Sequence, residues 1–360
     1  MDFSPVFEYN SETISYEENS DFNEEFDEQE GGYVAIGGYQ FRPSFILFTV
    51  EPVGYHTALV EFRQDAIEKF KEFVYSKFPT PIAFVFERFE RGYENQQQRL
   101  KLLQDTWESI IYLLYALIVS EYRHFRFSMT ETAIKPKQIV SNKIDDRLSI
   151  IEQLITLAID KNHPLPCLNY ISNDVVDKLR ELNRVRNEFS HSFAKTDLQC
   201  RQTISRYQGD VLNILQGISE ISSITLARYV SQEESILSFR HEDFKGASLN
   251  RTFSAKDIMP DKLDSVSYHL NSRNVLAIHG EDIYCVTPFV HFRLDDIGNP
   301  KLCFYKQKRG RDVCLELFYE VLDGSGEVPL GEDQISKADF VNAINEIKNL
   351  LPDLSGRGSS

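Results

Sequence analysis

Apolar residues recur every three or four positions through the middle of the chain, which is the spacing of one buried helix face. The first such stretch begins at about Gln96 and runs through Ile118, and three more follow with short connections between them. Amphipathic helices joined in this way pack as a bundle. The pattern therefore predicts an all-α four-helix bundle at 95–228, whose later helices cover Ile144–Ala158, Asn173–Phe193 and Gln202–Ser222.

The segment before this region has a mixed pattern. Short apolar runs bounded by glycine and proline predict strands at Tyr33–Ile36, Phe45–Val50 and Ala83–Phe86. Helical spacing over Gln64–Phe78, closed by Pro79 and Pro81, predicts one helix between them. Residues 33–94 are therefore expected to form a small α/β domain.

After about Ser231 the period changes to two, which predicts strands. A serine at 336 followed by an aspartate three residues later marks the start of a last helix. Residues 229–354 are expected to form a strand-rich α+β domain, with a flexible tail at 355–360. The fold class is thus multidomain α+β, and the strands of this last domain are expected at Val275–Ile278, Ile283–His291, Leu302–Tyr305 and Cys314–Val321.

Acidic residues are concentrated at the start of the chain. Residues 1–32 hold eleven Asp and Glu and no Lys or Arg, which supplies −11 of the net charge of −16. Such a segment repels itself and has few aliphatic residues, so we expect a disordered leader. Phenylalanine and tyrosine are spread among the acids. Two interpretations stay open: a solvated segment that aids solubility, or a peptide that docks on a basic groove.

Membrane and metal chemistry find no support in the pattern. The longest apolar run, Ile110–Val119, is too short to cross a bilayer, and residues 1–32 lack the features of a signal peptide, so a cytoplasmic protein is expected. Five cysteines without a C-x-x-C pair argue against disulfides and against a zinc site, and no cofactor is expected. We interpret the one conceivable metal cluster as buried strand residues: Cys285, Cys303, Cys314, His279 and His291.

The chemistry is concentrated near the end of the third predicted helix, in the segment Leu182–Ser192. At about 100° per residue, His191 points away from the apolar stripe that contains Leu182, and Arg184 and Asn187 lie within about 40° of it. A histidine transfers protons near neutral pH, and an arginine binds phosphate and stabilises charge on its oxygens. This face is therefore suited to act on a phosphodiester.

The same segment resembles the HEPN family, whose signature is an arginine, often followed by asparagine, and a histidine four to six residues later. Here the match is Arg186-Asn187 followed by His191, within a predicted bundle of the expected kind. The resemblance covers about residues 95–228. It implies a metal-independent endoribonuclease that acts as a homodimer and leaves a 2′,3′-cyclic phosphate and a 5′-hydroxyl. By this resemblance His191 is the general acid and base, and Arg186 binds the scissile phosphate. Asn187 positions the phosphate or orients His191.

Arg186 does not fit a straight helix. It lies about 140° from His191 and only about 40° from the core-facing Leu182. Three explanations stay open. The helix distorts before His191, or Arg186 acts on the partner subunit's site, or Arg186 is structural and Arg184 faces the phosphate.

Local charge favours a polyanionic substrate. Residues 178–208 contain seven basic and three acidic residues, a net charge of +4. We predict that Arg184, Lys195 and Arg201 contact RNA. A second basic cluster at 301–311, with Phe304 and Tyr305, either grips RNA or forms an ordinary charged hairpin.

The expected function is RNA cleavage by a homodimer, as a toxin or anti-phage defence effector with a possible regulatory protein partner and no membrane contact. Members of the same family also serve as non-catalytic scaffolds, antitoxins or regulatory modules. In those, the arginine, asparagine and histidine hold helix ends together. This alternative stays open at the sequence level.

Overall fold

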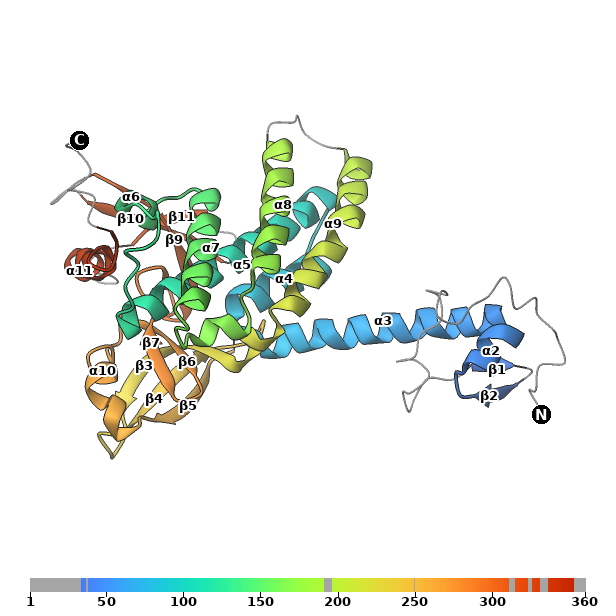
Figure 1. The fold of residues 1–360 in the computed structure, drawn as a ribbon, viewed down its shortest axis with the longest axis horizontal. Coiled ribbons are helices and arrows are strands. Elements are labelled where there is room, and N and C mark those ends of the chain that lie inside the picture. The colour runs from blue at the N-terminus through green and yellow to red at the C-terminus, as the bar shows by residue number, and fades with distance from the viewer. Residues whose placement is uncertain are drawn as a thin grey trace. The chain divides into compact units, whose positions relative to one another are not determined.

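The structure is a computed structural model that describes residues 34–36, 38–190, 196–248, 250–310, 315–322, 326–330 and 336–352, with the backbone alone at 187–190. The chain divides into two compact units, Met1–Phe73 and Val74–Ser360. Over the described ranges it is a mixed α+β protein with ten α-helices and three antiparallel sheets (Figure 1). The predicted boundaries at 94 and 228 both lie inside the second unit and stay predictions.

The first unit contains a small hairpin and a helix. Strands β1 (Val34–Ile36) and β2 (Tyr39–Phe41) pair antiparallel, and α2 (Phe45–Val50) follows. The predicted strand over these last residues is wrong. Ser44 caps the helix by accepting a hydrogen bond from the backbone N–H of Leu47, and Leu47 and Phe48 then turn into the core together. A six-residue apolar run does not distinguish a strand from a buried helix.

Helix α3 (Pro52–Lys77) includes the predicted helix Gln64–Phe78 and begins twelve residues earlier. The next element, α4 (Thr80–Arg91), replaces the predicted strand Ala83–Phe86, which is therefore wrong. Pro81 occupies the first turn, where a missing N–H costs nothing. The buried positions continue to Phe89 at helical spacing, beyond the four residues that suggested a strand.

Helix α5 (Gln96–Phe125) is the central element of the second unit. Every residue from Thr106 to Arg123 is buried. Helices α4, α7, α8, α9 and α11 all pack against it, as does strand β7. The helix is long and apolar enough to cross a membrane, yet 89% of its most apolar window is buried inside the protein. The predicted core helix around Ile110–Val119 is confirmed.

The other predicted helices are also present. They are α7 (Ile144–Asp160), α8 (Asn173–Ser190) and α9 (Asp197–Gly217), preceded by a short α6 (Pro136–Ile139). Helix α8 packs against both α7 and α9. Thr196 and Gln199 form a capping box that starts α9 five residues before the predicted position. The predicted continuation of α8 to Phe193 lies outside the described residues.

The strand-rich region contains two sheets. The first has the order β5-β4-β3-β6-β7 and the second β11-β10-β9-β8, all antiparallel. The predicted strand Ile283–His291 is wrong as one element, because it breaks around Pro288, which has no N–H for a strand ladder. Strands β3, β4, β5 and β11 were not predicted. The bounds are β3 Ile224–Gln232, β4 Ser238–Phe244, β5 Thr252–Asp257, β6 Val275–His279, β7 Asp282–Cys285, β8 Val290–Leu294, β9 Pro300–Arg309, β10 Glu316–Val321 and β11 Gly326–Pro329.

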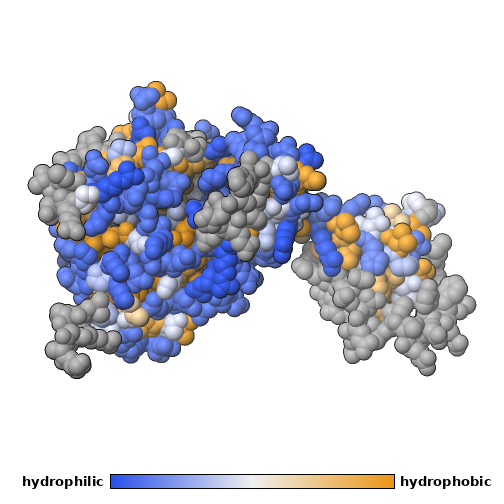
Figure 2. Space-filling view, turned by 90° about the horizontal axis from the view of Figure 1, so that it is seen from above, coloured by the Kyte–Doolittle hydropathy of each residue, from blue (hydrophilic) through white to orange (hydrophobic). Residues whose placement is uncertain are grey.

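A short α10 (Leu263–Ser267) and a last helix α11 (Lys337–Lys348) complete the second unit. The predicted cap is confirmed, since Ser336 accepts a hydrogen bond from the N–H of Asp339 at 3.4 Å. Of the five residues interpreted as buried strand residues, Cys285, Cys303 and His291 are confirmed as such. His279 is a half-buried strand residue, and Cys314 lies outside the described residues. The visible surface of this unit is mainly hydrophilic, with apolar residues in small groups (Figure 2).

Buried polar side chains of α5 join the helices to the sheets. Glu121 accepts hydrogen bonds from the N–H of Cys167 at 3.0 Å and from the hydroxyl of Tyr284 at 2.8 Å. Arg123 donates to the carbonyl oxygens of Thr287 and Cys285. Burial raises the pKa of Glu121, so the tyrosine hydroxyl and the amide are needed to satisfy its oxygens.

Candidate functional site at the end of helix α8

Helix α8 places the predicted motif at its C-terminal end. Arg184 and Arg186 lie in its last two turns, and Arg201 lies in the first turns of α9. The backbone of Asn187 belongs to α8, but its side chain lies outside what the structure describes, as do His191 and Lys195. Of the three proposed catalytic side chains, the structure therefore places only Arg186.

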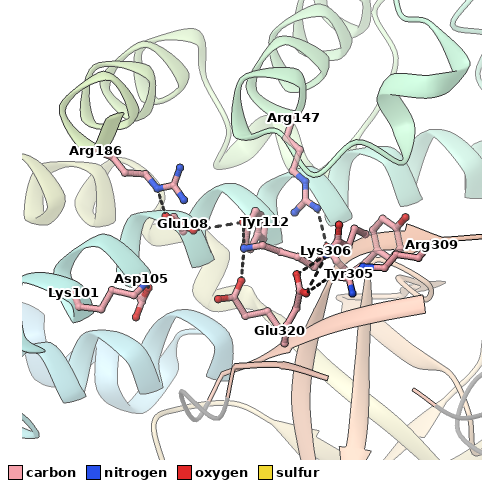
Figure 3. A network of polar contacts seen from close by, with 12 residues as sticks. Lys101, Asp105, Glu108, Tyr112, Arg147, Arg186, Tyr305, Lys306, Arg309 and Glu320 are labelled. Atoms are coloured by element: carbon pink, nitrogen blue, oxygen red, sulfur yellow. Dashed lines mark hydrogen bonds and ion pairs between the residues drawn. The ribbon is translucent and has the colours of Figure 1, made fainter. Parts of the chain in front are cut away.

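Arg186 faces the central helix. Its Nε lies 2.5 Å from Oε1 of Glu108 in α5 (Figure 3). The Arg186 side chain is 34% exposed, whereas that of Glu108 is 7% exposed. Burial raises the pKa of Glu108, and the positive charge of Arg186 opposes this shift. The pair therefore stabilises a carboxylate that would otherwise be costly to bury, and it ties α8 to α5.

The other residues of α8 follow the faces that the sequence predicts. Leu179 and Leu182 are buried, while Arg184 is exposed. Asn183 is buried beside them and donates from its amide to Oδ1 of Asp145 at 2.7 Å. The third explanation for Arg186 was that it is structural and that Arg184 faces the phosphate. The ion pair of Arg186 and the exposure of Arg184 agree with it, and the contact with phosphate stays a prediction.

The ion pair continues into a polar network that reaches the second sheet (Figure 3). The hydroxyl of Tyr112 lies 3.5 Å from Oε2 of Glu108, and Nζ of Lys306 donates to Tyr112 at 3.1 Å. Lys306, in β9, also pairs with Glu320 in β10 at 2.5 Å. Burial disfavours the charge of Lys306, but Tyr112 and Glu320 outweigh it and raise its pKa. The network thus connects the motif helix to strands β9 and β10 through α5.

Arg147 of α7 supports the same network. Its guanidinium lies over the Tyr112 ring, 4.2 Å from the centroid, and donates to the carbonyl oxygen of Tyr305 at 2.7 Å. A cation over an aromatic face is stabilised by the ring quadrupole, most strongly when water is excluded. Arg147 is buried, so this contact fixes the orientation of Tyr112.

A cavity of about 310 Å³ lies beside the network, with walls from α4, α5, β9 and β10. On its wall, Oδ1 of Asp105 forms an ion pair with Nζ of Lys101 at 2.5 Å. Burial raises the pKa of Asp105. Over the described ranges, no group of three or more His, Cys, Asp or Glu side chains is arranged to hold a metal ion. Two carboxylates on this wall each face a cation: Asp105 faces Lys101 and Glu108 faces Arg186.

The predicted basic strip is only partly available to a ligand. Arg180 pairs with Glu152 at 2.6 Å and with Asp177 at 3.0 Å, and Arg186 is held by Glu108. Arg184 and Arg201 are exposed. In the second basic cluster, Lys306 belongs to the network above, and Arg309 pairs with Glu327 and covers the Phe318 ring. These contacts fit a charged hairpin.

Sequence reasoning did not find the network residues, which are Glu108, Tyr112, Lys306 and Glu320. One signal was present, because Glu108 stands at the start of the longest apolar run of the chain. A carboxylate flanked by buried helix residues requires a cationic partner or hydrogen-bond donors. The partner's identity depends on how α8 packs on α5, which the spacing of apolar residues does not specify.

Comparison with known proteins gives no family assignment. No protein-family model, curated protein or solved structure matches the chain. The interpretation of the site therefore depends on its own residues.

Proposed function

We propose that the chain is a metal-independent endoribonuclease of the HEPN type, with its site at the C-terminal end of α8. The observation that carries the proposal is the exposed Arg184, which lies in the last two turns of α8 on a helix held against α5 by the Arg186–Glu108 ion pair. In the proposed arrangement α5, α7, α8 and α9 form the four-helix bundle that the family resemblance implies.

In the proposed reaction the 2′-hydroxyl of RNA attacks the adjacent phosphorus. His191 removes the hydroxyl proton, and a protonated group, supplied by His191 of the second subunit or by water, protonates the departing 5′-oxygen. The products are a 2′,3′-cyclic phosphate and a 5′-hydroxyl, so atoms and charge balance without a metal ion. Arg184 binds the scissile phosphate, and Lys195 and Arg201 bind neighbouring phosphates. Arg186 acts through Glu108 as a positioning residue, and Asn187 orients His191.

The biological setting of the proposal follows the resemblance. The enzyme acts as a homodimer in the cytoplasm, as a toxin or anti-phage effector, and a regulatory protein controls it. The acidic leader at 1–32 is a candidate internal regulator, because its charge is complementary to the basic strip at 178–208.

The test uses the full chain, mixed RNAs that include tRNA, and a buffer that contains EDTA. The proposal expects cleavage products with cyclic-phosphate ends, and it expects the His191→Ala variant to fold normally but leave the RNA intact. A metal-dependent product, or cleavage that persists in the variant, contradicts it.

One observation favours the second candidate, a non-catalytic interaction module. The guanidinium of Arg186 contacts a buried carboxylate of its own chain, which is the geometry of a residue that holds helix ends together. Under this alternative, His191→Ala changes partner binding or stability, and neither the full chain nor a chain without residues 1–32 cleaves RNA.

A further inference from the structure

A cleft in the second unit lies away from α8. It has a volume of about 690 Å³ and opens beside a second hollow of about 220 Å³. The two share five lining residues from α5, the segment after α10, β7 and α11. Their combined size is typical of pockets that hold a small organic molecule. The shared residues are Arg123, Tyr268, His269, Cys285 and Glu346.

The floor of this cleft is rigid. The guanidinium of Arg123 is nearly buried, donates to two backbone carbonyl oxygens and lies 4.0 Å from the carboxylate of Glu346. The N–H of Met129 donates to the carbonyl oxygen of Leu350 at 2.7 Å, which ties the end of α5 to the end of α11. A cleft with fixed walls binds a ligand without a large ordering cost.

Two neutral imidazoles line the cleft. Burial, and then the charges of Arg123 and His124, lower the pKa of His269 to about 4. Burial also lowers the pKa of His124. At neutral pH each ring therefore offers one hydrogen-bond donor and one acceptor in place of a charge. Asn342 and Asn349 of α11 add amide groups, which likewise donate and accept.

An aromatic ring stands at the edge of the cleft. Tyr268 is 74% exposed, and its ring meets that of His269 edge to face, with centroids 5.3 Å apart. An exposed tyrosine beside neutral donors and acceptors is the combination that binds a flat heteroaromatic ring by stacking and by its polar edge. Arg126 is exposed and caps the C-terminus of α5 in the left-handed conformation, and it places a cation at the same edge.

The charges on the walls limit the ligand. The lining contains two cations, Arg123 and Arg126, and three carboxylates, so the cleft has no excess positive charge for a polyphosphate. The carboxylates are those of Asp264, Asp339 and Glu346. A neutral ligand fits this balance, and a single phosphate fits only at Arg126, which is exposed at the edge of the cleft.

We propose that this cleft binds a nucleoside or a nucleoside 5′-monophosphate, with the base stacked on Tyr268, its polar edge hydrogen-bonded to the imidazoles, and any phosphate on Arg126. The site is separate from the proposed nuclease site. Arg123 lies fifteen residues after Glu108 on α5, which is about 22 Å along the helix. The inference therefore stands whether or not the chain cleaves RNA.

The test is isothermal titration of the full chain with each of the four ribonucleosides, their 5′-monophosphates, ribose and inorganic phosphate. At least one nucleoside is expected to bind with a dissociation constant of about 1 mM or tighter. Ribose and inorganic phosphate are expected not to bind. Tyr268→Ala should weaken that binding about fivefold or more, because the stacked ring is lost. Arg126→Ala should weaken the binding of the monophosphate and leave the binding of the nucleoside unchanged.

Tyr39→Ala is the matched control, since Tyr39 is 70% exposed in the first unit. Because Tyr268 is exposed, its removal should leave the fold intact, which circular dichroism checks. In the unaltered chain, ligand should also shift the NMR signals of His124 and His269. The proposal is wrong if no nucleoside binds, if Tyr268→Ala binds as tightly as the unaltered chain, or if inorganic phosphate alone accounts for the binding.

Discussion

Arg186 and Glu108 form an ion pair that joins the motif helix α8 to the central helix α5, with Nε and Oε1 2.5 Å apart. The carboxylate is buried and the guanidinium is partly exposed. The two partners therefore differ in what their removal costs. Loss of Arg186 leaves a buried charge, whereas loss of Glu108 leaves a cation that water can still reach.

Replacing Arg186 with methionine should destabilise the protein in a pH-dependent way. The unbranched apolar side chain of methionine keeps the packing of the arginine stem but removes the charge that offsets Glu108. We expect a loss of about 1–3 kcal/mol in the free energy of unfolding at pH 7. Urea unfolding of the variant and of the unaltered chain measures the difference.

The sign of the pH effect follows from Glu108. Burial already raises the pKa of this carboxyl above its ordinary 4.5, and loss of Arg186 raises it further. Near pH 4 Glu108 is largely protonated in both the folded and the unfolded variant, so the variant should lose little stability there. The loss in the free energy of unfolding should grow as the pH rises toward 7. Arg184→Met, at an exposed position, is the control and should change stability by less than about 0.5 kcal/mol at either pH.

Removing Lys306 should loosen the contact between α5 and the second sheet. Lys306→Met takes away the partner of Glu320 and of the Tyr112 hydroxyl. We expect a loss of about 1–2 kcal/mol, because Tyr112 is buried while Glu320 is partly exposed. The exposed Lys308→Met is the matched control. A double-mutant cycle with Glu320→Gln that shows no coupling contradicts the network.

Acid should destabilise the protein through His269. Its pKa is about 4 in the folded protein and 6.5 as an ordinary value, so the unfolded chain takes up a proton that the folded chain does not. The stability that this group contributes is present above pH 6.5 and is lost as the pH falls toward 4. His269→Gln should reduce the slope of unfolding free energy against pH over that window, by at most about 1.4 kcal/mol per pH unit. An NMR titration that gives His269 a pKa near 6.5 contradicts this prediction.

Deleting residues 1–32 should raise ribonuclease activity if the acidic leader covers the basic strip. Its charge of −11 is complementary to the net charge of +4 at 178–208. The measurement compares initial cleavage rates of the full and shortened chains at low and high salt. The difference should shrink at high salt, because screening weakens the attraction. Equal rates at low salt mean that the leader does not inhibit the enzyme.

The helices with long apolar stripes could be predicted from the sequence, since α5, α7, α8 and α9 all repeat their buried positions over several turns. The short apolar runs could not be assigned. Phe45–Val50 and Ala83–Phe86 form helices because Ser44 and the turn at Pro79 and Pro81 start them, and four to six residues carry too little periodicity to show it. Strands β4 and β5 were missed because polar and charged residues interrupt the apolar alternation, and in β4 His241 and Glu242 are themselves buried.

For the candidate site, the angular position of Arg186 was the informative feature. Helical geometry places it near the buried Leu182, and in the structure it reaches a residue of α5. That residue is Glu108, and the network continues from it through Tyr112 to Lys306. The contact between Tyr112 and Lys306 joins positions 194 residues apart in the chain. Local periodicity does not specify contacts over such a separation.

Helix α5 supplies the core for the helices and also holds the sheets through Glu121 and Arg123. Neither part keeps a complete interior when it is separated from the other. A fragment that ends after α9 would lack Tyr284, which donates a hydrogen bond to the buried Glu121. A fragment that begins at β3 would lack the helix against which β7 packs. The region from Val74 onward is therefore expected to unfold as one cooperative unit, because α5 belongs to the interior of both its helical and its strand-rich part.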